Sequence, residues 1–171
     1  MSTKERIRQF FAENNLPFLL LCGFVFLASG FLSAFFTGGS ELYSDILLPS
    51  FAPPAFVFPL VWSILYLLIG ASFGIVFLDK RKGLSTEKRK GLILLILQHL
   101  FNLIWYPLFF GAQNFFVSLV DILIMIFLTV LVIYFFSAIS KTATVFLFIY
   151  LLWLVFAALL NAGALVLNGI G

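Results

Sequence analysis

Residues 115–139, FFVSLVDILIMIFLTVLVIYFFSAI, decide the fold class because this long apolar run contains a single charged residue, Asp121. The hydrocarbon core of a bilayer is about 30 Å thick, and a helix of about 20 apolar residues spans it. Inside lipid, a helix satisfies the backbone hydrogen bonds within one segment. The run therefore predicts a transmembrane α-helix.

Four more apolar runs share these properties, and nothing in the chain alternates like the strands of a β-barrel. The chain has 171 residues and is 63% hydrophobic but only 10% charged, with a mean hydropathy of +1.18. A soluble domain carries about 25% charged residues. We predict an all-α polytopic membrane protein, a bundle of five transmembrane helices. The predicted spans are 17–37, 54–79, 91–111, 114–139 and 142–168, with a cytoplasmic N-terminal extension at 1–16 and a lid loop at 38–53.

The basic residues predict the orientation. All ten Lys and Arg fall within residues 4–8, within residues 80–90 or at Lys141. With five spans, these regions share one side of the membrane. Cytoplasmic loops carry the excess of Lys and Arg, so we expect an integral protein of a bacterial cytoplasmic membrane, with the N-terminus inside and the C-terminus outside. The basic clusters are topology signals and do not predict a nucleic-acid partner.

Polar residues within the spans are the first candidates for function, because they are costly in hydrocarbon. Asp121 is the only acid well inside a span, and it fits either a proton-linked or ligand-orienting carboxylate or a hydrogen-bonded tie between helices. Gln98 and Asn102 lie four residues apart on the third span. His99 has no second histidine as a partner and the one cysteine is distant, so no metal site is predicted.

Aromatic and small residues recur at helical spacing. The stripe that contains Trp153, Ala157 and Asn161 fits a groove for a flat molecule, although its spacing alone favours close helix packing. The same two interpretations hold for Phe58, Trp62 and Tyr66 on the second span.

Small residues at spacing four predict close helix contacts. Gly70 and Gly74 form a GxxxG pattern that suits packing within one chain or in a dimer, and Gly30 and Ala34 form a weaker pair. Pro107 predicts a kink in the third span. The sequence has no nucleophile–base pair, P-loop or CxxC motif.

Three motifs resemble the TspO/translocator-protein family. They are Tyr43-x-x-Ile46-x-x-Pro49-x-Phe51-x-Pro53-Pro54 with Val61-Trp62-x-x-Leu65-Tyr66, then Asn102-x-x-Trp105-x-Pro107-x-Phe109-Phe110-Gly111, and Tyr150-Leu151-x-Trp153-x-x-Phe156-Ala157-x-x-Leu160-Asn161. Leu42, Leu48 and Phe51 stand where the family has Trp, Lys and Trp.

The resemblance implies a five-helix bundle whose cavity opens toward the loop between the first two helices. It implies porphyrin or another flat aromatic molecule as ligand, no required cofactor, membrane lipid as surroundings and a homodimer. The expected ligand-binding residues are Tyr43, Pro49, Phe51, Phe58, Trp62, Tyr66, Asn102, Trp105, Asp121, Trp153, Ala157 and Asn161.

Three functions remain open at this stage. The first is a sensor or regulator that binds tetrapyrrole. The second is a light-dependent porphyrin-degrading enzyme with Trp62 and Trp153 as the oxidisable groups. The third is a transporter of a small apolar solute, for which Asp121 is the best feature.

Overall fold

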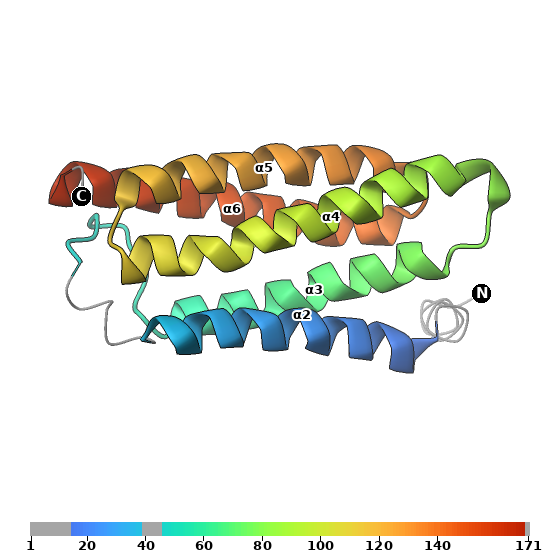
Figure 1. Ribbon diagram of the computed structural model, residues 1–171, viewed down its shortest axis with the longest axis horizontal. Helices are drawn as coiled ribbons and strands as arrows, with labels where there is room; N and C mark the ends of the chain where they lie inside the picture. The colour runs from blue at the N-terminus through green and yellow to red at the C-terminus, as the bar shows by residue number, and fades with distance from the viewer. Residues whose placement is uncertain (1–14, 39–45, 170–171) are drawn as a thin grey trace.

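The computed structural model describes residues 15–38 and 46–169, and these residues form an all-helical bundle without a strand (Figure 1). Five helices are long and apolar enough to cross a membrane, which confirms the predicted fold class. They are α2 (Leu16–Thr37), α3 (Val57–Leu78), α4 (Ser85–Tyr106), α5 (Phe115–Ser137) and α6 (Lys141–Asn168). The short elements are the 3-10 helix η2 (Lys82–Leu84) and the π-helical turn η3 (Pro107–Gly111).

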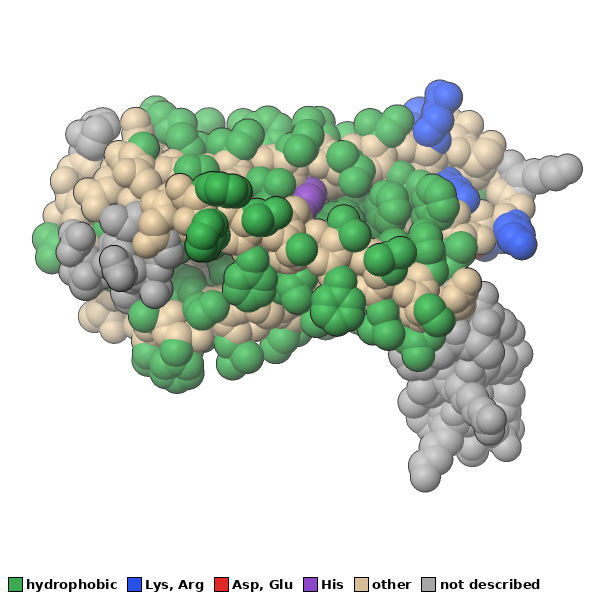
Figure 2. All heavy atoms as spheres, turned by 60° about the horizontal axis from the view of Figure 1, so that its bottom comes forward, with side chains coloured by type: hydrophobic (Ala, Val, Ile, Leu, Met, Phe, Trp, Pro, Cys, Tyr) green, Lys and Arg blue, Asp and Glu red, His purple; other side chains and the backbone are tan. Residues whose placement is uncertain are grey.

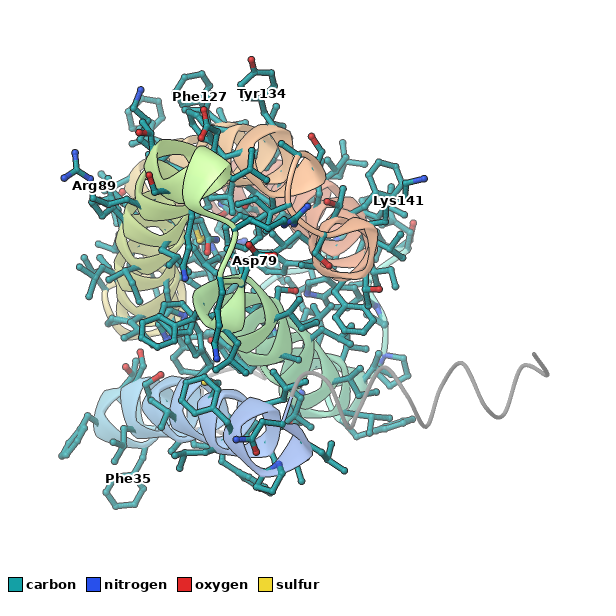
Figure 3. The ribbon with its side chains drawn as sticks, turned by 90° about the vertical axis from the view of Figure 1, so that its right-hand side faces the viewer. Phe35, Asp79, Arg89, Phe127, Tyr134 and Lys141 are labelled. Atoms are coloured by element: carbon teal, nitrogen blue, oxygen red, sulfur yellow. The ribbon has the colours of Figure 1, made fainter. Side chains whose placement is uncertain are left out.

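The five helices run side by side along one long axis (Figure 1). Helices α2 and α3 pack together, and α4, α5 and α6 form the other part of the bundle, with α3 also packed on α6. The connections between consecutive helices from α3 to α6 are short, and they force these helices to run antiparallel. The core is therefore a set of interhelical seams, and many large apolar side chains, such as Phe35 and Phe127, face outward as lipid contacts require (Figure 3).

Two helix starts differ from the sequence expectation by three residues or more. Helix α4 begins at Ser85, ahead of the expected start at residue 91, because Thr86 to Lys90 continue the helix beyond the apolar run. Helix α3 begins at Val57, after the expected start at residue 54, because Pro54 closes a turn in which the Val57 amide donates to its carbonyl at 2.9 Å.

The GxxxG pattern of α3 packs against α2 of the same chain. A Cβ atom added at Gly70 would lie 2.5 Å from the Cys22 carbonyl oxygen, and one at Gly74 would lie 2.7 Å from Leu19 Cδ2. The two backbones approach closely because these residues lack side chains. Of the two interpretations left open by the sequence, the structure shows the contact within the chain.

Pro107 ends the regular part of α4. A π-helical turn follows, in which the Ala112 amide donates to the Pro107 carbonyl at 2.8 Å. The next residues turn the chain back, with Gln113 in the left-handed region at φ 47°. The Asn114 side chain then accepts from the Val117 amide at 3.0 Å and caps α5.

Basic side chains gather at one end of the molecule, and apolar side chains cover most of its length (Figure 2). Two of these cations satisfy helix C-termini. Arg81 pairs with Asp79 at 2.8 Å and also donates to the Ile139 carbonyl, while Lys88 Nζ donates to the Phe77 and Asp79 carbonyls. The Arg81 guanidinium lowers the pKa of the Asp79 carboxyl. Figure 3 shows Asp79 near the centre of this basic end.

Candidate functional site

A cavity of about 360 Å³, named the large cavity, lies between α2, α3 and α4, in the half of the bundle away from the basic end. Ligand pockets in proteins range from about 300 to 1,000 Å³ and are mostly apolar with a few placed polar groups. This cavity fits that description. Its described lining residues are Leu27, Gly30, Phe31, Ala34, Phe35, Pro59, Trp62, Ser63, Tyr66, Asn102, Trp105 and Tyr106.

Trp62 is the centre of the aromatic wall. Its ring centroid lies 6.2 Å from that of Trp105 and 5.6 Å from that of Tyr66, both of which also line the cavity. Behind it, Trp153 packs edge-on with a centroid distance of 6.5 Å and an interplanar angle of 90°. Tyr150 lies at 6.3 Å in a similar edge contact. Such packing holds the Trp62 ring in place.

A hydrogen-bonded chain forms the polar part of the lining. The Tyr66 hydroxyl donates to Asn102 Oδ1 at 2.5 Å, and Asn102 Nδ2 donates to the Tyr150 hydroxyl oxygen at 2.8 Å. Gln98 Nε2 donates to the same oxygen. The chain fixes the Asn102 amide, so its remaining lone pair and N–H are presented in a defined direction.

Gly30 explains how Tyr66 reaches this position. A Cβ atom at Gly30 would lie 2.2 Å from Tyr66 Cε2 and 2.5 Å from Tyr66 Cζ. The ring therefore lies directly on the backbone of α2, which only glycine allows.

A second cavity, of about 20 Å³, lies on the other side of Trp105. A hollow of this size holds about one water molecule. The Trp105 indole N–H donates to Asn161 Oδ1 at 3.1 Å, and Asn161 Nδ2 donates to the Phe115 carbonyl at 2.8 Å. The indole separates the two cavities. The small cavity is lined by Leu48, Phe58, Trp105, Phe109, Phe110, Ala157, Leu160 and Asn161.

The described part of the loop before α3 covers the small cavity and is fastened to α6. The Leu47 backbone and the Asn168 amide exchange two hydrogen bonds, at 3.0 and 2.8 Å. Pro49 lies on Gly163, where an added Cβ would meet Pro49 Cγ at 2.8 Å. Phe51 contacts Phe156 edge-on at 6.5 Å. The pairing of a side-chain amide with a peptide group fixes this segment at one point.

The structure divides the expected binding residues into groups. Trp62, Tyr66, Asn102 and Trp105 line the large cavity. Phe58, Trp105, Ala157 and Asn161 line the small one. Pro49, Phe51, Asp121 and Trp153 line neither. Tyr43 lies outside the described residues.

Asp121 and Trp153 each have a polar atom without a partner. Asp121 is buried, and its Oδ2 has no hydrogen bond among the described residues. The Trp153 indole N–H is also buried and unpaired there. Buried polar groups are normally satisfied, and Gln98 Oε1 and His99 Nδ1 are the other such exceptions among the described residues.

The sequence did not point to the contribution of α2. Leu27, Gly30, Phe31 and Ala34 line one side of the large cavity. The only signal for them is the spacing of Gly30 and Ala34, which predicts a close contact but not a cavity.

His99 is held between helices rather than in a metal site. Its Nε2 lies 2.8 Å from the Ser29 hydroxyl, and the Phe26 ring is 4.4 Å away. Within residues 15–38 and 46–169 no group of three His, Cys, Asp or Glu side chains could hold a metal ion.

Comparison with known proteins finds one matching family and several relatives. Residues 20–167 match the TspO/MBR family. The tryptophan-rich protein TspO of Chlorobaculum tepidum is 37% identical over 152 residues, which cover 88% of this chain and 95% of that protein. The translocator protein of Bos taurus is 33% identical, with 85% and 88% covered. The tryptophan-rich sensory protein of Cereibacter sphaeroides is 29% identical, with 90% of each chain covered.

Proposed function

The chain belongs to the TspO/MBR family, and from this premise we propose that it binds porphyrin or a similar flat hydrophobic ligand within the membrane and acts as a sensor or regulator. One relative carries the name tryptophan-rich sensory protein, which supports a sensing role. We propose porphyrin as a ligand and not as a required cofactor.

The observation that carries the proposal is the large cavity with its wall of Trp62 and Trp105. Flat aromatic molecules gain stability by offset stacking or edge contacts with such rings. Asn102, fixed by Tyr66 and Tyr150, supplies an oriented polar group. An open cavity of about 360 Å³ holds part of a tetrapyrrole and leaves its edge in lipid.

The surroundings of the site follow from the charge distribution. The described basic residues lie at one end of five spanning helices, so we propose that this end and the N-terminus face the cytoplasm.

We further propose a homodimer. Gly70 and Gly74 are not available for the dimer interface, because they pack on α2 of the same chain.

Titration of the purified protein with protoporphyrin in the dark, followed by tryptophan fluorescence, tests the proposal. We expect saturable quenching at one ligand per chain and an affinity about tenfold lower in Trp62→Phe, which shrinks the stacking surface. Leu32→Ala on the lipid face of α2 is the matched control and should bind as the wild type does. Quenching that never saturates would remove the proposal.

Light-dependent breakdown of bound porphyrin is a second candidate. It is favoured by the position of Trp62, an oxidisable indole that faces the cavity. Illumination with bound porphyrin should then bleach the porphyrin bands faster in wild type than in Trp62→Phe at equal occupancy. Equal rates would leave the binding function and exclude the enzymatic one.

A further inference from the structure

We propose that the ligand enters the large cavity sideways from the bilayer, through a mouth between α2 and α3, and that the ligand class is therefore membrane-dissolved amphiphiles. This inference rests on the proposed function, because it concerns the route into the same site. It adds that the described part of the loop before α3, residues 46–56, is not the entrance.

The α2 residues of the lining form a stripe that turns from the interior to the lipid. Gly30 is buried, Leu27 and Ala34 are half-buried, and Phe31 and Phe35 are exposed by 54% and 76%. At 100° per residue these positions progress around one side of the helix. The rim of the cavity on α2 thus consists of side chains that face acyl chains.

Helix α3 supplies the opposite rim. Trp62, Ser63 and Tyr66 are half-buried, whereas Pro59 on the same lining is exposed. The Ser63 hydroxyl donates to the Pro59 carbonyl at 2.6 Å, so it presents no free donor at the mouth. The opening between the two helices is therefore apolar, as a passage from lipid must be.

The seam between α2 and α4 is closed. Ser29 and His99 lie 2.8 Å apart, and the Ser33 hydroxyl donates to the Leu103 carbonyl at 2.6 Å. Nearer the end of α2, Thr37 Cγ2 lies 2.9 Å from where a Gly111 Cβ would be. Three contacts along the seam leave no passage on that side.

The described part of the loop, residues 46–56, does not lead into the large cavity. Leu48 is its one residue that lines a cavity, and it lines the small one, which shares Trp105 with the large one. Entry beneath Leu48 would require the Asn168 pairing with Leu47 to open and the Trp105 indole to leave Asn161.

The distribution of polar groups specifies the ligand. Tyr66 and Asn102, which are uncharged and bonded to each other, are the polar pair of the lining, whereas the Ser63 hydroxyl at the mouth donates to its own helix. A molecule that dissolves in lipid and carries a neutral hydrogen-bonding group, such as a ring N–H or a carbonyl, matches this order.

Stopped-flow quenching in phosphatidylcholine vesicles tests the route, with protoporphyrin delivered from preloaded vesicles of the same lipid. Ser63→Phe and Ala34→Phe narrow the mouth from α3 and α2. Their matched controls, Ile64→Phe and Leu32→Phe, place the same ring on the lipid face one or two residues away. We expect association and dissociation to slow together, each by about tenfold, in the mouth variants and to stay unchanged in the controls.

Asn168→Leu provides the opposing test, because it releases the loop without touching the mouth. The proposal expects wild-type rates. A faster association in Asn168→Leu together with unchanged rates in Ser63→Phe and Ala34→Phe would overturn the lateral route. A mouth variant that loses affinity only through faster dissociation would also overturn it, since the residue would then act as part of the site. If wild type shows no saturable binding, the proposed function itself fails, which is a separate outcome.

Discussion

Gly30→Ala tests how the cavity is built, because the new methyl group would lie 2.2 Å from the Tyr66 ring. The ring must retreat by about 1.2 Å to reach an ordinary contact of 3.4 Å. A shift of that size misaligns the 2.5 Å bond from the Tyr66 hydroxyl to Asn102. Hydrogen bonds between transmembrane helices contribute about 0.6 kcal/mol on average and at most about 1.7. Alanine recovers up to about 1 kcal/mol of helix propensity, so we expect little net change in stability.

Ligand binding should respond much more than stability. The retreat moves one wall of the cavity and releases the Asn102 amide, and we expect the affinity for protoporphyrin to fall about tenfold, equivalent to about 1.4 kcal/mol. Dark fluorescence titration measures the affinity, and thermal unfolding in detergent checks the fold. Gly83→Ala is the control, since a Cβ there meets nothing within 4 Å. Wild-type affinity in Gly30→Ala would refute the role given to the Tyr66–Asn102 pair.

Three other perturbations follow from the same structure. Tyr150→Phe leaves two buried amide donors without their shared acceptor and should lower the free energy of unfolding by about 1–3 kcal/mol, measured by chemical unfolding in detergent; an unchanged value would contradict the network. Gly70→Ala puts a methyl group 2.5 Å from the backbone of α2 and should cost about 1–3 kcal/mol without changing the oligomeric state; dissociation of a dimer at full stability would show that this face serves another chain. Because Arg81 lowers the pKa of Asp79 in the folded protein, this pair stabilises the fold above the ordinary aspartate pKa of 3.8, and that stability is lost as the pH falls through the lowered value. Unfolding midpoints between pH 7 and 3 should therefore decline less in Asp79→Asn than in wild type, and parallel curves would speak against the pair.

The fold could be predicted from the sequence because few backbone structures are stable in lipid. Apolar runs of about 20 residues must be helices, and the clustering of basic residues fixed which connections share a side. The ends of the helices could be predicted less well from the sequence. Residues 85–90 are polar, so the apolar pattern did not show that they belong to α4.

The site was predicted only in part. Trp62, Tyr66, Asn102 and Trp105 stood out as aromatic or polar exceptions, and the structure places them around one cavity. The sequence did not predict that α2 lines the cavity, because Leu27 and Phe31 cannot be told from lipid-facing residues by sequence alone. Which face of α2 meets α3 depends on Gly30 and the ring above it, a tertiary contact that spacing alone does not specify.

The position of bound protoporphyrin, determined by cryo-electron microscopy or crystallography of the complex, tests whether the large cavity is the binding site. We expect ligand density between α2, α3 and α4, with a ring against Trp62 or Trp105 and a polar group within reach of Asn102. Density beneath Leu48, with the large cavity filled only by lipid, would contradict it.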